Sequence, residues 1–178
     1  MTTAQARRQK LWQVTSALLS SDHDPAATTA RARRLRTRLE ASSLTVGDLL
    51  AAPAWLSLAP AELSDLARRT GAAAMAVRWR ATVDGAVLRR AAQAVGAPML
   101  RRLLDDTTLV DAGPADPGAM EGHAAALEAV GCAVLKASVS LELASRLEGR
   151  LRPYATVAIE KPAAGRFVAA ALVADEVT

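Results

Sequence analysis

The spacing of apolar residues along the chain predicts α-helices over most of its length. From Thr3 to Ser20, residues such as Leu11 and Val14 recur at steps of three or four, with basic side chains between them. The longest such pattern runs from Ala61 to about Val83 and passes through Gly71 without losing phase. We therefore expect one continuous amphipathic helix across that glycine.

Capping residues set the limits of the other predicted helices. Pro25 and Pro98 suit a first helical turn, and Gly96 suits the left-handed cap that ends a helix. Beyond the two helices already described, the predicted helices span about Pro25–Ala41, Thr45–Ala52, Ala86–Val95, Pro98–Asp106, Ala119–Ala137 and Leu141–Leu151.

Two segments do not follow the helical pattern clearly. Residues Thr107–Gly118 contain two prolines and two glycines, which predicts a flexible loop. Near the C-terminus, the runs Thr156–Ile159 and Phe167–Ala174 fit either a short β-hairpin or a final helix, because short apolar runs do not distinguish the two.

The amino-acid composition, together with this helical pattern, indicates a fold class. A chain of 178 residues is near the size of one domain, so we expect residues 1–178 to form a single domain. Hydrophobic residues make up 51% but aromatic residues only 3%, which favours closely packed helices over a β-sandwich. The expected fold is an all-α, irregular helical bundle, with Trp12 and Trp55 in its core.

The chemistry needed for catalysis is not recognisable in the sequence. His23 is expected in a loop and His123 in a helix, about a hundred residues away, and neither has a motif around it. Cys132 lies in the apolar run Val130–Leu135, where a buried thiol is the usual outcome. No glycine-rich phosphate loop is present in the sequence. We therefore predict no enzyme, no cofactor, no metal site and no small-molecule substrate.

Charge and cysteine content bear on location and partners. The single cysteine forms no internal disulfide, and we recognise neither a signal peptide nor a transmembrane segment, so the expected location is the cytoplasm. The net charge is +4 and the pI about 10.0 because arginine dominates the cations. This fits an acidic protein surface, nucleic acid or a coding bias toward arginine.

One local pattern suggests DNA binding. Ala67, Gly71 and Val77 have the spacing of a small residue, a turn glycine and a core aliphatic in a helix-turn-helix, and arginines lie nearby. Against this, the apolar stripe continues through Gly71, and Arg80 stands where the second helix needs an inward apolar residue. A helix-turn-helix regulator is therefore the alternative hypothesis, and only this alternative implies nucleic acid as a partner.

Two segments resemble the SctK family of type III secretion sorting-platform proteins. The first runs from Leu56 to Ala72 and continues through Arg78, Arg80, Val83–Leu88 and Val95–Gly96; the second runs from Val130 to Leu141 and from Arg146 to Pro153. The resemblance implies a non-enzymatic cytosolic adaptor of the sorting platform, located at the inner membrane through protein partners. Those partners would be the inner-membrane ring protein and the pod protein SctQ.

Two groups of residues are candidates for binding such partners. Trp79 lies between Arg78 and Arg80, and aromatic and arginine side chains are enriched at binding hot spots. The alternative is that Trp79 belongs to the core and the two arginines are solvated. The second group, Arg33, Arg34 and Arg38, belongs to a helix with five arginines in eight residues, which either faces an acidic partner or phosphates, or is simply solvated.

Overall fold

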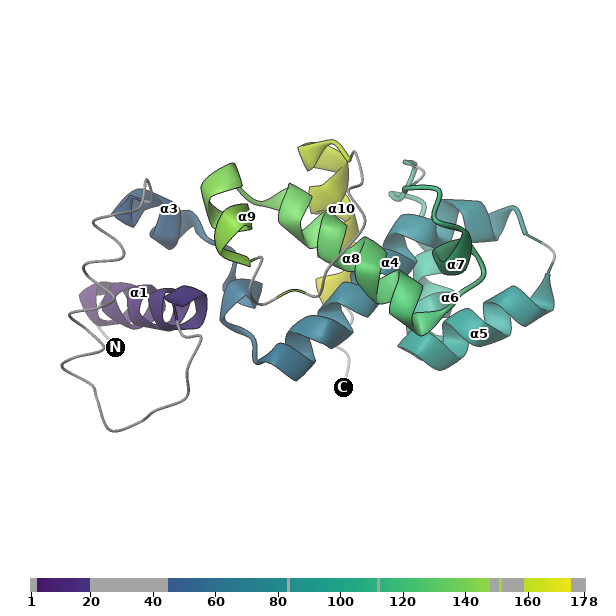
Figure 1. The fold of residues 1–178 in the computed structure, drawn as a ribbon, viewed down its shortest axis with the longest axis horizontal. Coiled ribbons are helices and arrows are strands. Elements are labelled where there is room, and N and C mark those ends of the chain that lie inside the picture. The colour runs from purple at the N-terminus through teal and green to yellow at the C-terminus, as the bar shows by residue number, and fades with distance from the viewer. Residues whose placement is uncertain are drawn as a thin grey trace. The chain divides into compact units, whose positions relative to one another are not determined.

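The computed structural model describes residues 3–19, 45–82, 84–111, 113–147, 151 and 159–173. These residues form α-helices and one short 3-10 helix, and no β-strand occurs among them (Figure 1). The predicted all-α class is confirmed. The predicted helix at 25–41, with Arg33, Arg34 and Arg38, lies outside the described residues.

The chain divides into two compact units, the first comprising residues 1–59 and 140–150. In this unit α1 (Thr3–Leu19) contacts α3 (Val46–Ala51), the 3-10 helix η1 (Ala54–Ser57) and α9 (Leu141–Leu147). Thr45 and Asp48 form a capping box at the start of α3, and the hydrogen bonds from Thr45 lower the pKa of Asp48. The prediction of a single domain stays a prediction.

The two tryptophans of the first unit differ in burial. Trp55 is 4% exposed, as predicted, but Trp12 is 50% exposed, so its assignment to the core is wrong. The buried residue of α1 is Val14, which is 1% exposed. Because a helix turns about 100° per residue, Trp12 lies about 200° around the axis from Val14 and faces the other side.

The second unit comprises residues 60–139 and 151–178. Its helices are α4 (Pro60–Arg80), α5 (Gly85–Val95), α6 (Ala97–Asp105), α7 (Pro117–Met120), α8 (Ala124–Ser138) and α10 (Lys161–Leu172). Helices α4 and α8 pack together, α10 contacts both, and α5, α6 and α7 each contact α4 (Figure 1). The pair α4–α8 is therefore the centre of this unit.

Helix α4 is continuous through Gly71, as its pattern predicted. A Cβ atom on Gly71 would lie 2.0 Å from the carbonyl oxygen of Leu127 in α8, so the helices touch backbone to backbone there. Residues Ala72 to Ala76 are all fully buried. The helix-turn-helix proposed for Ala67, Gly71 and Val77 is therefore wrong, because that motif needs a break at Gly71 and an exposed second helix.

Other boundaries differ from the predicted ones. The helix expected over Ala119–Ala137 is split into α7 and α8, because Gly122 adopts a left-handed conformation (φ 79°) that ends the first. His123 is consequently the N-cap of α8 rather than an interior residue. Phe167–Ala171 lies in α10, which decides that part of the C-terminal run in favour of a helix.

The remaining terminal residues and the loop are partly described. Residues 156–158 and 174 lie outside the described residues. The predicted loop is non-helical at residues 107–111 and 113–116, and Leu109 within it is only 1% exposed. Its flexibility stays a prediction. In the described part of the chain, no helix has the length and apolar character needed to cross a membrane.

Candidate partner-binding site

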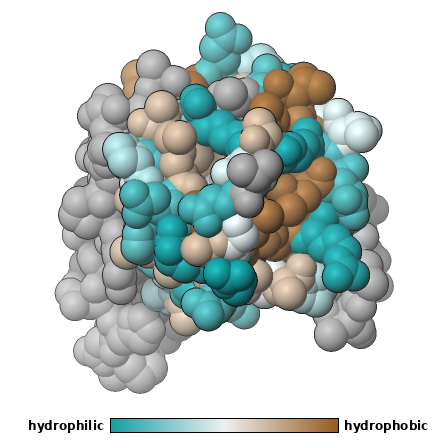
Figure 2. Space-filling view, turned by 90° about the vertical axis from the view of Figure 1, so that its right-hand side faces the viewer, coloured by the Kyte–Doolittle hydropathy of each residue, from teal (hydrophilic) through white to brown (hydrophobic). Residues whose placement is uncertain are grey.

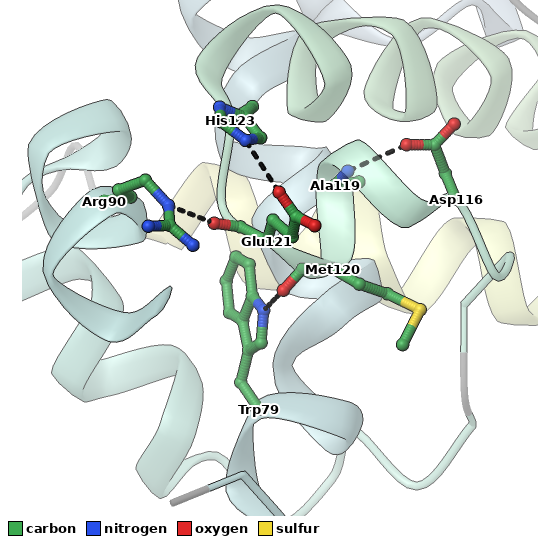
Figure 3. Close-up of polar contacts among 7 residues, drawn as sticks. All are labelled: Trp79, Arg90, Asp116, Ala119, Met120, Glu121 and His123. Atoms are coloured by element: carbon green, nitrogen blue, oxygen red, sulfur yellow. Dashed lines mark hydrogen bonds and ion pairs between the residues drawn. The ribbon is translucent and has the colours of Figure 1, made fainter. Parts of the chain in front are cut away.

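The candidate residues Arg78, Trp79 and Arg80 form the last turn of α4. Trp79 is 2% exposed, and its indole Nε1 donates a hydrogen bond of 2.9 Å to the carbonyl oxygen of Met120 (Figure 3). The alternative interpretation, in which Trp79 belongs to the core, is confirmed. Trp79 leaves almost no surface for direct contact with a partner, which corrects the first interpretation.

Arg80 is exposed but fully engaged by the protein. Its guanidinium donates to the carbonyl oxygens of Leu104 (2.8 Å), Leu109 (2.8 Å) and Leu103 (3.1 Å), and also to that of Asp106. These carbonyls belong to the end of α6 and the chain after it, where a helix leaves acceptors unsatisfied and favours a positive charge. Arg80 therefore caps α6 from a neighbouring helix.

Arg78 holds the loop that follows. Its Nη2 donates to the carbonyl oxygen of Gly113 at 3.0 Å, while its buried Nε has no hydrogen-bond partner. The amide of Gly113 in turn donates to the carbonyl oxygen of Ala74 at 2.9 Å. A Cβ atom on Gly113 would lie 2.3 Å from that same oxygen, so only glycine fits this close approach. The loop is thus bound to α4 through backbone and side chain together.

The turn between α7 and α8 completes this region. Asp116 caps α7 by accepting from the amide of Ala119 at 2.8 Å, and Arg90 donates from Nε to the carbonyl oxygen of Glu121 at 2.8 Å (Figure 3). His123 and Glu121 lie 3.0 Å apart, Nε2 to Oε2, and both side chains are exposed. These contacts join α5, α7 and the end of α4 into one packed group.

The Arg78–Arg80 segment therefore organises the surrounding backbone. Neither arginine is merely solvated, because both donate to carbonyl oxygens of the protein. A partner that contacted them would have to compete with these hydrogen bonds. Their role in binding stays a prediction, and a surface with unengaged charged groups lies elsewhere on the unit.

Such a surface lies on α5 and α6, and sequence reasoning missed it. We define the α5–α6 face as the half-buried Leu88, Val95 and Leu104 together with the exposed Arg89 and Arg101. Figure 2, which views the side where α5 and α6 lie, shows a strip of apolar side chains with hydrophilic ones on both sides. The sequence signal for this face was that apolar residues of α5 and α6 extend beyond the positions needed for one buried stripe.

The residues considered for catalysis lie apart. Cys132 is buried in α8, as predicted, whereas His123 is exposed at the start of that helix. At a rise of 1.5 Å per residue they are about 13 Å apart along the axis, too far for a thiol–imidazole pair. Among the residues that the structure describes, no three His, Cys, Asp or Glu side chains gather in a way that could hold a metal ion.

Similarity to known proteins gives no independent assignment of this surface. No protein-family model, no curated protein and no solved structure matches the chain.

Proposed function

We propose that this chain is a non-enzymatic adaptor of a type III secretion sorting platform, which links the inner-membrane ring to the pod protein SctQ. It would act in the cytoplasm, held at the inner membrane by its protein partners. The proposal follows from the resemblance to the SctK family, and one structural observation supports it.

That observation is the contact between the two resembling segments. Gly71 belongs to the first segment and Gly131 to the second. A Cβ atom on Gly71 would lie 2.0 Å from the Leu127 oxygen, and one on Gly131 would lie 1.7 Å from the Ala67 oxygen. Two motifs sixty residues apart thus supply the two glycines of one helix contact. This favours a shared structural requirement over a chance likeness of alanine-rich helices.

The surroundings of the contact suit an adaptor. The polar side chains at the end of α4 are bound to backbone carbonyls, so they fix the positions of α6, the loop and α7. A body fixed in this way presents its outer faces in a constant arrangement, which lowers the entropic cost of binding. Surface complementarity would then carry the function.

The proposal is tested by reconstitution. The purified chain of residues 1–178, treated with nuclease, is mixed with SctQ and with the cytosolic domain of the ring protein from the same organism. We expect one complex that contains all three proteins, detected by size-exclusion chromatography with light scattering. Addition of duplex DNA should leave the complex unchanged.

Two results would count against the adaptor. Failure of the folded chain to bind either protein would reject it. Binding that is recovered only when DNA is restored would point to nucleic acid as the true partner, at a site other than the rejected helix-turn-helix.

A further inference from the structure

We infer that the α5–α6 face docks an acidic amphipathic helix of a protein partner. The inference rests on the proposed function only for the identity of that partner, which would be SctQ or the ring protein. Apolar surface and unpaired charge on the face support the docking itself, and one experiment distinguishes the failure of either proposal.

The apolar part of the face comes from leucines and a valine that the fold covers incompletely. On α5, Val87 and Ala91 are buried against the body of the unit, whereas Leu88 and Val95 are only half-buried. Leu88 and Val95 are seven residues apart and therefore lie on the same side of the helix. Leu104 of the contacting helix α6 is half-buried as well. Figure 2 shows an apolar strip on the side of the unit where these helices lie.

The arginines beside this strip differ from the others in the unit. Arg80 and Arg90 donate to backbone carbonyls, but Arg89 and Arg101 are exposed and form no hydrogen bond or ion pair with the described part of the chain. Arg102, half-buried on α6, differs from these two because its charge acts on the Asp106 carboxylate. The guanidinium groups of Arg89 and Arg101 are available to carboxylates outside the chain.

The acidic residues of α5 and α6 do not balance this charge. Asp84 caps α5 through the amide of Ala86 at 2.8 Å, and Asp106 binds the amide and hydroxyl of Thr108. Only Asp105 is exposed without such a contact in the described residues. The face therefore carries an excess of unengaged positive charge, which favours an acidic partner and disfavours a second copy bearing the same excess.

A helix is the partner element that fits best. Apolar positions seven residues apart on α5, next to a further leucine on α6, match the spacing of an apolar stripe on another helix. Acidic residues beside that stripe would reach Arg89 and Arg101 at the rim, where charged pairs mainly set specificity and association rate.

The test uses charge reversals measured against two probes. Arg89→Glu and Arg101→Glu are compared with Lys161→Glu, which makes the same charge change at an exposed position of α10. Unchanged circular dichroism and thermal melting would verify that each variant is folded. The first probe is the pair of secretion proteins; the second is a labelled helical peptide with leucines at three- and four-residue steps and glutamates elsewhere, alongside its scrambled version.

We expect each reversal on the face to weaken binding about tenfold and Lys161→Glu to change it less than twofold. If the secretion proteins bind but all variants bind equally, the docking inference fails while the adaptor proposal stands. If only the patterned peptide binds, and depends on Arg89, the adaptor proposal fails while the inference stands. Equal binding of patterned and scrambled peptides, no binding to either probe, or a wild-type dimer dissociated by Arg89→Glu, would overturn the inference.

Discussion

Helices α4 and α8 meet backbone to backbone at two glycines, whereas the buried side chains of α5 and α6 include valine, leucine and methionine. At Gly71 and Gly131 the backbones are so close that a Cβ atom has no room. On the α5–α6 face, Leu88 and Leu104 are only half-buried. A close backbone contact thus fixes the unit with little exposed apolar surface, while the helices packed beside it retain surface for binding.

Gly131→Ala is expected to have one of the two largest effects. The added Cβ would lie 1.7 Å from the Ala67 oxygen, and because that atom is backbone, the helices must move apart. We expect a loss of about 3 kcal/mol in the free energy of unfolding, near the upper end of overpacking costs. Urea denaturation monitored by circular dichroism measures it.

Gly165→Ala in α10 is the matched control, because a Cβ there meets nothing within 4 Å. Alanine should stabilise that helix by about 0.5–1 kcal/mol. If both variants changed stability alike, the α4–α8 contact would not be as tight as described.

Truncation of leucines compares the two regions directly. Leu66 in α4 is fully buried, so Leu66→Ala should cost about 3 kcal/mol through lost burial and a cavity. Leu88→Ala should cost about 1 kcal/mol, because this side chain is half-buried and water can fill the space. Equal losses in denaturation experiments would show that α5 belongs to the core as much as α4 does.

This contrast also explains what the sequence could predict. The helical spacing of apolar residues correctly predicted that α4 continues through Gly71, because the residues before and after this glycine keep the same spacing. It missed the break at Gly122, since a single glycine between apolar residues does not reveal that its φ is positive. In the fold, Gly122 lies so close to the amide of Ala91 and the carbonyl oxygen of Val87 that an added Cβ atom would meet both.

The candidate site was harder to predict because its contacts are not local. Arg80 binds carbonyls of residues 23 to 29 positions away, and Trp79 binds one 41 positions away. Neither partner is identifiable from spacing along the chain. The wrong assignment of Trp12 has a different origin, because α1 buries only one face and its composition does not tell which.

The two tryptophans provide the next test. Trp79→Phe removes the donor to the Met120 oxygen and part of a buried ring, so we expect a loss of about 2 kcal/mol. Trp12→Phe should change stability by less than about 0.5 kcal/mol, because Trp12 is half exposed. Thermal or urea unfolding of the two variants checks this, and a larger loss for Trp12→Phe would contradict the burial described for α1.

The smallest effect is expected at Asp106, the residue that ends α6, which is one of the two less tightly packed helices. The hydrogen bond from the Thr108 hydroxyl is the main cause that lowers the pKa of the Asp106 carboxyl. The Thr108 amide and the charges of Arg80 and Arg102 also lower this pKa, whereas burial raises it. Because the folded pKa lies below the ordinary value of 3.8, the carboxylate adds stability above that pH and loses it as the pH falls through the lower, folded value. Asp106→Asn should therefore be less stable than the wild type near neutral pH, and the difference should vanish at acidic pH. The expected difference is under about 1 kcal/mol because the carboxylate is near the surface. Unfolding of both proteins measured from about pH 6 to about pH 2.5 would detect this pH dependence. A stability difference that stayed constant over that range would mean that the Asp106 carboxylate does not support the end of α6.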